Sequence, residues 1–271
     1  MTTAEVRLVP ANAVSDLRRL EPLARAVFGQ GQRPPGWFER KLHRECVSAS
    51  QSWLLTTAAQ ADDARGWVGY GLLGTPPSLA PIARTAGIGL LAPWRGRGEG
   101  RRLVDALRDA AAAAGSTGLR IPASPHSAPF YTRCGLQALD PTLTLLAFGT
   151  GHHDASPALA WDAPLPGPVQ SAWLREGWER APHPFTVEVR DGHDRFDVSM
   201  EGSAHVAMRW TSSDGSPDAP QAWLERVPRG APALLHEVPA GAPFVQTLLE
   251  RGWTVVQRTI TMQATWASTP G

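Results

Sequence analysis

The chain has 271 residues, 42% of them hydrophobic, and its 26 basic and 25 acidic residues leave a formal net charge of +1. This length allows one large domain or two smaller ones, and the balanced charge gives no electrostatic support for binding nucleic acid or an anionic membrane. The two cysteines make no disulfide framework, no apolar run reaches the about 18 residues of a membrane span, and the opening MTTAEVRLVP has no signal-peptide pattern. We therefore expect a cytoplasmic protein without nucleic-acid or membrane partners.

The first half of the chain alternates strand-like and helix-like segments, as judged from the spacing of apolar residues. Pro22 predicts a kink in the first helix or a later start near Glu21. Gly115 follows the longest apolar stripe, where a left-handed helix cap is expected. The predicted elements, in chain order, are a strand at 4–8, a helix at 14–28, a helix at 37–46, strands at 52–57, 66–74 and 85–92, a helix from about 100 to 114, a strand at 119–123, a short helix at 127–135 and a strand at 143–148.

The stretch APWRGRGEGRRL, residues 92–103, joins a predicted strand to a predicted helix. Glycines at 96, 98 and 100 allow a tight turn, and a helix N-terminus exposes unpaired N–H groups that bind anions. Successive N–H groups in such a turn form a concavity for phosphate oxygens. Four arginines (Arg95, Arg97, Arg101 and Arg102) add cations suited to phosphate, so we expect a phosphorylated small molecule here.

Two common phosphate-binding motifs do not fit this stretch. A Walker A loop needs Lys followed by Ser or Thr after its last glycine, whereas Arg101 and Arg102 follow Gly100. The dinucleotide fingerprint G-x-G-x-x-G needs a glycine where this chain has Arg101. An exposed basic turn without a ligand is the alternative interpretation of the turn taken by itself.

Two motifs together resemble those of the GCN5-related N-acetyltransferases, the GNAT family. The family pattern Q/R-x-x-G-x-G/A after a strand matches Arg95 to Gly100 position for position. The family's second signature, an aromatic–Tyr pair shortly before Gly-Phe, reads Phe130-Tyr131 and then Gly135-Leu136, with leucine in place of phenylalanine. The order of predicted elements also matches, so the resemblance covers roughly residues 4–149.

The resemblance implies transfer of an acyl group, usually acetyl, from acetyl-CoA to an amine. It implies that Tyr131 is the general acid for the thiolate, the alternative being that Tyr131 only packs beside the cofactor. Backbone N–H groups at Leu90 and Leu91 would polarise the thioester carbonyl. The cofactor-binding residues so implied are Leu90, Leu91, Arg95, Gly96, Arg97, Gly98, Glu99, Gly100 and Arg101.

The general base and the acceptor are not identified by the sequence. The strand before the loop lacks the carboxylate that many family members have, and Glu99 is expected to face solvent at the helix start. His126, Glu45 or a water chain remain as candidates. The acceptor can be a small molecule or a peptide, the chain a monomer or a homodimer. A non-catalytic module that senses acyl-CoA or binds a protein is the alternative function.

The second half resembles a degenerate copy of the first. Ala-Pro-Phe recurs at 128–130 and 242–244, each followed by Gly and a large apolar residue and then by a long strand. Val245 takes the position of Tyr131, and no glycine turn precedes it. We therefore expect a mixed α/β (α+β) fold, with a GNAT-like central mixed sheet flanked by helices and a second, smaller GNAT-like domain.

The predicted domain boundaries follow from composition. A catalytic domain is expected over 1–150, a Gly- and Pro-rich linker over 151–167, and the degenerate copy over 168–271. The linker contains His152, His153 and Asp154, but no further ligand stands at a regular spacing, so no metal site is expected.

Overall fold

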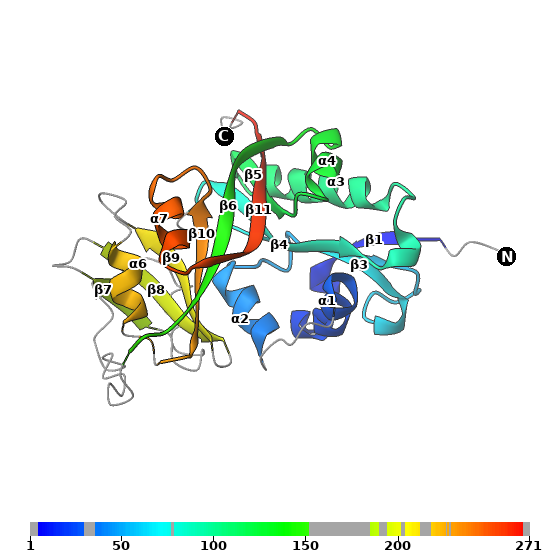
Figure 1. Ribbon diagram of the computed structural model, residues 1–271. Helices are drawn as coiled ribbons and strands as arrows, with labels where there is room; N and C mark the ends of the chain where they lie inside the picture. Colours follow the sequence, from blue (N-terminus) through cyan, green and yellow to red (C-terminus); the bar gives the residue numbers. More distant parts are fainter. Residues whose placement is uncertain are drawn as a thin grey trace. The chain divides into compact units, whose positions relative to one another are not determined.

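The computed structural model describes residues 5–29, 36–76, 79–151, 185–189, 194–201, 204–211, 218–225, 227 and 229–267 (Figure 1). It divides into two compact units. The first unit comprises Met1–Ile121, Phe130–Gln137 and Met262–Gly271, and the second comprises Pro122–Pro129 and Ala138–Thr261. Within the described residues, no helix has both the length and the apolar character needed to cross a membrane.

The first unit is built on a mixed sheet. Its strands, in spatial order, are β1 (Arg7–Pro10), β2 (Trp53–Thr56), β3 (Trp67–Gly74), β4 (Ile82–Leu90), β5 (Gly118–Ala123) and the end of β11 (Thr254–Thr265). The strands from β1 to β4 pair antiparallel, whereas β4 and β5 pair parallel. All of β3 is buried, because helices cover both faces of the sheet at this strand.

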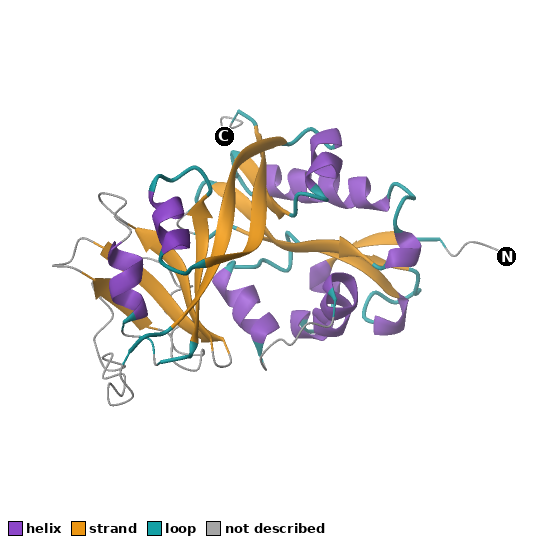
Figure 2. Cartoon of the chain, viewed as in Figure 1, coloured by secondary structure: helices purple, strands orange, loops and turns teal. Residues whose placement is uncertain are grey.

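The helices of the first unit lie on opposite sides of β3 and β4, α1 and α2 on one side and α3 on the other (Figure 2). A Cβ atom at Gly71 would contact leucines of α3, and one at Gly89 would lie 2.3 Å from Val27 of α1, so both glycines permit close packing. The helices are α1 (Glu21–Phe28), α2 (Trp37–Arg44), α3 (Glu99–Ala113) and α4 (Ala128–Arg133), with short 3₁₀ turns η1 (Ala11–Ala13), η2 (Leu17–Leu20), η3 (Ala64–Gly66) and η4 (Ala92–Trp94).

Local signals for helix ends agree with the structure. The first predicted helix begins at Glu21, with Pro22 in its first turn, because proline there removes only an N–H that has no intrahelical partner. The long helix α3 ends before Gly115, whose φ is +81°, and the Ser116 N–H donates to the Ala111 carbonyl at 3.0 Å. Both expectations are confirmed.

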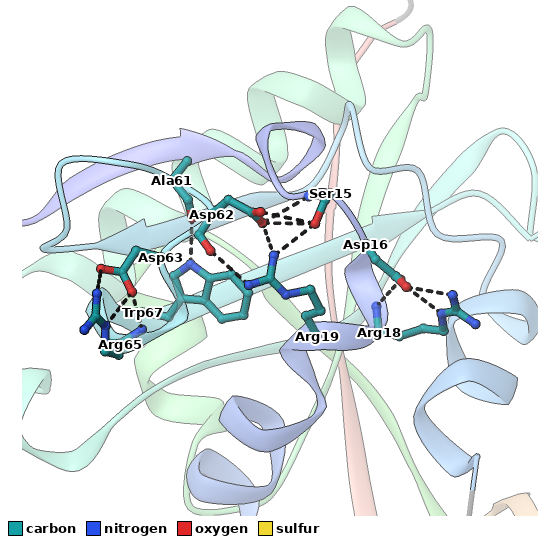
Figure 3. A network of polar contacts seen from close by, with 9 residues as sticks. All are labelled: Ser15, Asp16, Arg18, Arg19, Ala61, Asp62, Asp63, Arg65 and Trp67. Atoms are coloured by element: carbon teal, nitrogen blue, oxygen red, sulfur yellow. Dashed lines mark hydrogen bonds and ion pairs between the residues drawn. The ribbon is translucent and has the colours of Figure 1, made fainter.

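A cluster of ion pairs on the surface of the first unit joins η2 to the loop before β3 (Figure 3). Arg19 pairs with Asp62 and lies over the Trp67 ring at 5.5 Å, while Asp62 also accepts from the Ser15 N–H. The Ser15 N–H and the Arg19 guanidinium lower the pKa of Asp62. On the same loop Arg65 pairs with Asp63 at 3.0 Å and is otherwise solvent-exposed.

The strands and α-helices from β7 to β11 repeat the order of those from β2 to β6, namely three strands, a helix, a strand, a helix and a strand. In the second unit β7, β8 and β9 form an antiparallel meander, β9 pairs parallel with β10, and β10 pairs antiparallel with β6. The core contains Trp223 and Trp253, stacked at 6.3 Å. The elements are β6 (Gln137–Phe148), β7 (Phe185–Val189), β8 (Asp194–Glu201), β9 (Ala204–Thr211), α6 (Asp218–Leu224), β10 (Pro232–Pro239), α7 (Phe244–Glu250) and β11.

The two long strands β6 and β11 are each divided between the units. From Ala138 onward β6 belongs to the second unit, where it pairs with β10, while the end of β11 lies beside β5 in the first. There the Trp266 N–H donates to the Thr117 carbonyl at 3.0 Å. The predicted linker, apart from Gly151, lies outside the described residues, so the predicted domain boundaries stay a prediction.

Candidate functional site

The predicted phosphate-binding turn lies between η4 and α3. Gly96 and Gly98 have φ values of +75° and +88°, and a Cβ atom at either position would meet nothing within 4 Å. Gly98 is the N-cap of α3 and receives no side-chain cap. The backbone N–H groups from Gly96 to Arg101 donate to no backbone carbonyl of the described residues. The turn is thus an open concavity lined by unpaired N–H donors, which is what an anion requires.

The third glycine of the motif has a different role. A Cβ atom at Gly100 would lie 3.1 Å from the Phe130 ring and 3.4 Å from the Leu90 side chain. Gly100 therefore allows α4 to pack against the start of α3, which brings the two sequence motifs together in the first unit. The sequence pattern does not separate this packing role from contact with a ligand.

Two of the predicted arginines donate hydrogen bonds to backbone carbonyls of neighbouring elements. Arg95 Nε donates to the Leu90 carbonyl at 3.0 Å, and its terminal nitrogen donates to the Val27 carbonyl at 3.4 Å. Arg101 donates to the carbonyl of Arg133 at the end of α4. These contacts fix the turn to β4, α1 and α4, so both arginines position the backbone as well as adding positive charge.

The remaining two arginines point in different directions. Arg97 lies over the Trp94 ring with its guanidinium carbon 5.0 Å from the ring centroid. Arg102 donates to the Val6 carbonyl at 3.0 Å and pairs with Glu99 at 3.3 Å. The side chain of Glu99 is only 18% exposed, so the expectation that it faces solvent is wrong, because Arg102 folds over it.

Strands β4 and β5 diverge beside the turn. They pair in register only from Ile82 to Arg84 on β4 and from Gly118 to Arg120 on β5, although β4 continues to Leu90. Beyond these residues the edge of β4 that faces β5 has no strand partner in the described part of the chain. Such an edge offers N–H and C=O groups to an extended ligand, although the Leu90 carbonyl already accepts from Arg95.

The register of β4 on β3 determines which N–H groups face this gap. The Leu91 N–H donates to the Val68 carbonyl at 2.9 Å, toward β3. Because hydrogen-bonded pairs alternate in an antiparallel ladder, the N–H groups of Ile88 and Leu90 point the other way, into the gap. Leu91 is therefore corrected as a donor to the thioester, and Ile88 is the residue that sequence reasoning missed. Because N–H groups two residues apart on a strand point to the same edge, the assignment of Leu90 could have indicated Ile88 from the sequence.

Tyr131 lies on α4 and is 7% exposed. Its ring packs edge-on against Phe130, with centroids 5.0 Å apart. Burial, and to a smaller extent the nearby Cys134 thiol, raise the pKa of Tyr131 to about 12. A phenol with this pKa stays protonated at neutral pH and is available as a proton donor.

The raised pKa of Tyr131 predicts a stability change in alkali. An unfolded tyrosine ionises near pH 10, so the folded protein holds this proton more tightly, and stability should fall as the pH rises from about 10 to 12. We expect Tyr131→Phe to reduce this fall, as measured by urea unfolding at a series of pH values. In a parallel titration at 295 nm, the parent minus the variant should give a step near pH 12. A step near pH 10 would contradict the burial argument.

The candidate general bases do not converge on one residue. Glu45, at the end of α2, is 8% exposed and forms an ion pair with Arg84 of β4 at 3.6 Å. His126 is exposed in the turn before α4, in a segment that belongs to the second unit. Among the described residues no group of three or more His, Cys, Asp or Glu side chains is placed to hold a metal ion.

Comparison with known families matches the part of the chain that carries both motifs. The family described as "Acetyltransferase (GNAT) family" matches residues 17–136, which include both motifs. This segment, residues 17–136, is called the GNAT domain below. The match supports acyl transfer as the chemistry of the GNAT domain. No curated protein matches the chain.

Solved structures resemble the chain over nearly its whole length. A protein from Pyrococcus horikoshii assigned as an acetyltransferase is 12% identical with a TM-score of 0.66, and the match covers 99% of this chain and 92% of that one. A tandem GNAT protein from the clavulanic acid biosynthesis pathway is 14% identical with a TM-score of 0.61, over 98% and 100%. A GCN5-related N-acetyltransferase from Sphaerobacter thermophilus is 12% identical with a TM-score of 0.59, over 98% of each chain. At these identities the likeness shows the fold, so the predicted mixed α/β fold with a central mixed sheet is confirmed.

Proposed function

We propose that the GNAT domain transfers an acetyl group from acetyl-CoA to an amine. The observation that carries this proposal is the continuity of two features in the first unit: an open turn of unpaired N–H groups, and directly before it the free edge of β4. Coenzyme A has matching parts, a pyrophosphate and an extended arm with amide groups. The arm can add to the edge of β4 as a further strand would, with its pyrophosphate at the turn.

Each proposed role follows from this orientation. The N–H groups from Gly96 to Glu99 bind the pyrophosphate, and the N–H groups of Ile88 and Leu90 bind the arm and the thioester carbonyl, where negative charge develops during attack. Acetyl-CoA supplies the activated acyl group. Tyr131, held against Phe130, donates its proton to the departing thiolate.

The second unit is proposed to be a copy without this site. Its order of strands and helices repeats that of the first unit, and the fold likeness to a tandem GNAT protein supports a repeat. Val245 takes the position of Tyr131 and is buried in an apolar core. A valine cannot donate a proton to a thiolate, so the repeat lacks this part of the chemistry.

Titration of coenzyme A into the purified chain tests the proposal. We expect one site per chain by isothermal titration calorimetry. Arg97→Ala should weaken binding about tenfold, the low end for a charge-assisted hydrogen bond because solvent screens an exposed guanidinium. Arg102→Ala, the matched control, should change the affinity less than threefold, since Arg102 turns toward Val6 and Glu99.

Two other outcomes contradict parts of the proposal. Two sites of equal affinity per chain would show that the second unit binds coenzyme A as well. Binding at one site, without release of free coenzyme A when a broad set of amines is supplied with acetyl-CoA, would identify the chain as an acyl-CoA-sensing module rather than a transferase.

A further inference from the structure

Two arginines stand side by side where β4 and β5 separate. Arg84 and Arg120 are Cα partners in the parallel pair and are the last residues of the two strands that pair in register. Partners on neighbouring parallel strands are about 4.8 Å apart and project from the same face of the sheet. The two guanidinium groups therefore lie on one face at the closed end of the gap.

The two arginines differ in their partners. Arg84 forms an ion pair with the buried Glu45 at 3.6 Å. Arg120 is half-buried, and its Nε donates to the amide oxygen of Gln263, from the end of β11, at 2.6 Å. In the described part of the chain no acidic side chain pairs with Arg120, so a neutral amide holds this cation. A half-buried cation next to another cation favours a bound anion.

The two arginines lie on the face of the sheet from which the acceptor amine is expected to approach. Glu45, the partner of Arg84, follows α2, so both arginines project from the side of the sheet that bears α1 and α2. The anion-binding turn opens at the start of α3, and Phe130, next to Tyr131, packs there, so the proposed pyrophosphate site and the proposed general acid belong to the α3 and α4 region. An amine that attacks the thioester in the gap therefore approaches from the opposite side.

We propose that the acceptor amine carries a carboxylate, and that Arg120 binds it. This inference rests on the proposed function, because it places the amine at the thioester near Ile88. Four residues of strand separate Arg84 from Ile88, which corresponds to about 13 Å. An arginine side chain spans part of this distance, so the carboxylate lies several bonds from the amine. The amide of Gln263 fixes Nε and leaves the terminal nitrogens for a carboxylate in fork geometry.

Binding of matched ligand pairs tests the proposal without requiring turnover. The probes are N-acetyl ω-amino acids with one to six methylene groups, which resemble products, and their uncharged primary amides. We expect the parent chain with coenzyme A to bind the carboxylate at least tenfold more tightly than the amide at one or more chain lengths, as measured by calorimetry. Equal affinity for both members of every pair would overturn the proposal.

Two variants assign the preference to Arg120. Arg120→Gln should remove it by deleting the cation. Gln263→Glu should remove it while keeping Arg120, because a carboxylate then neutralises the guanidinium from within the chain. Arg65→Gln, which removes an exposed arginine paired with Asp63, should leave the preference unchanged. A preference that persists in both Arg120→Gln and Gln263→Glu would contradict the assignment.

The same samples separate this proposal from the one on which it rests. Coenzyme A alone is titrated into the parent and each variant, and we expect equal affinities. If coenzyme A fails to bind, the proposed function is wrong, and the pairs are compared without it as a direct test of anion binding. If coenzyme A binds and the pairs do not differ, only the proposal of a carboxylated acceptor is wrong.

Discussion

Replacing Tyr131 with phenylalanine is expected to lower turnover by about 10²–10⁴-fold, the usual contribution of a general acid. The ring remains packed against Phe130, so the affinity for coenzyme A should stay within twofold of the parent. The loss should therefore appear in kcat. This expectation rests on a buried phenol whose pKa lies far above neutral pH, so that the protonated form is available as the proton donor.

Steady-state release of coenzyme A and calorimetry of coenzyme A binding together measure this effect. A second variant, Tyr131→Leu, removes the ring as well, and we expect it to lower stability in urea in addition to turnover, because the edge-on contact with Phe130 is lost. If Tyr131→Phe turns over at the parent rate while Tyr131→Leu unfolds more easily, Tyr131 has a packing role alone.

The conformation of the glycine turn before α3 could be predicted from the sequence because its signals are local. Each feature depends on a few neighbouring residues: the glycines that adopt positive φ, the helix that starts directly after them, and the Gly115 cap at its end. The sequence does not show that Gly100 serves packing rather than contact with a ligand. Its neighbour Phe130 comes from α4, thirty residues further along the chain, and that contact depends on tertiary packing.

The identity of the strand donors depends on register, which the sequence leaves open. Leu90 and Leu91 are the same residue type, so the sequence does not distinguish them. The hydrogen bond from the Leu91 N–H to the Val68 carbonyl shows that the Leu91 N–H points toward β3 and the Leu90 N–H toward the gap. A shift of one residue in the pairing of β4 with β3 would exchange them. The same limit applies to β6 and β11, whose sequences predict strands but do not say that each strand is divided between the two units.

The contacts that charged side chains make also could not be predicted from the sequence. Arg101 and Arg102 are adjacent on α3, and helical geometry requires them to diverge. The structure shows that Arg101 contacts the end of α4, whereas Arg102 contacts Val6 and Glu99. The cluster of Arg84, Arg120 and Gln263 was invisible in the sequence, because three strands far apart along the chain bring these residues together.

Replacing Gly98 with valine is expected to weaken coenzyme A binding by at least 100-fold. The φ of Gly98 is +88°, a conformation that a β-branched residue adopts only under strain, so the turn and the first N–H groups of α3 must reorient. Loss of two charge-assisted hydrogen bonds to phosphate, each worth about 1.5–3 kcal/mol, accounts for a reduction of this size. A Cβ atom at this position meets nothing within 4 Å, so the loss cannot come from a clash inside the protein.

Gly115 provides the matched control at the other end of the same helix. Its φ is +81°, and a Cβ atom there also meets nothing within 4 Å, so Gly115→Val carries a similar backbone strain of about 1–3 kcal/mol. Urea unfolding should show comparable destabilisation of both variants, whereas calorimetry should show that only Gly98→Val loses coenzyme A. Equal affinity in Gly98→Val and the parent would show that the turn does not bind the cofactor. An equal loss in both variants would attribute the effect to strain in α3 rather than to the N–H groups at its start.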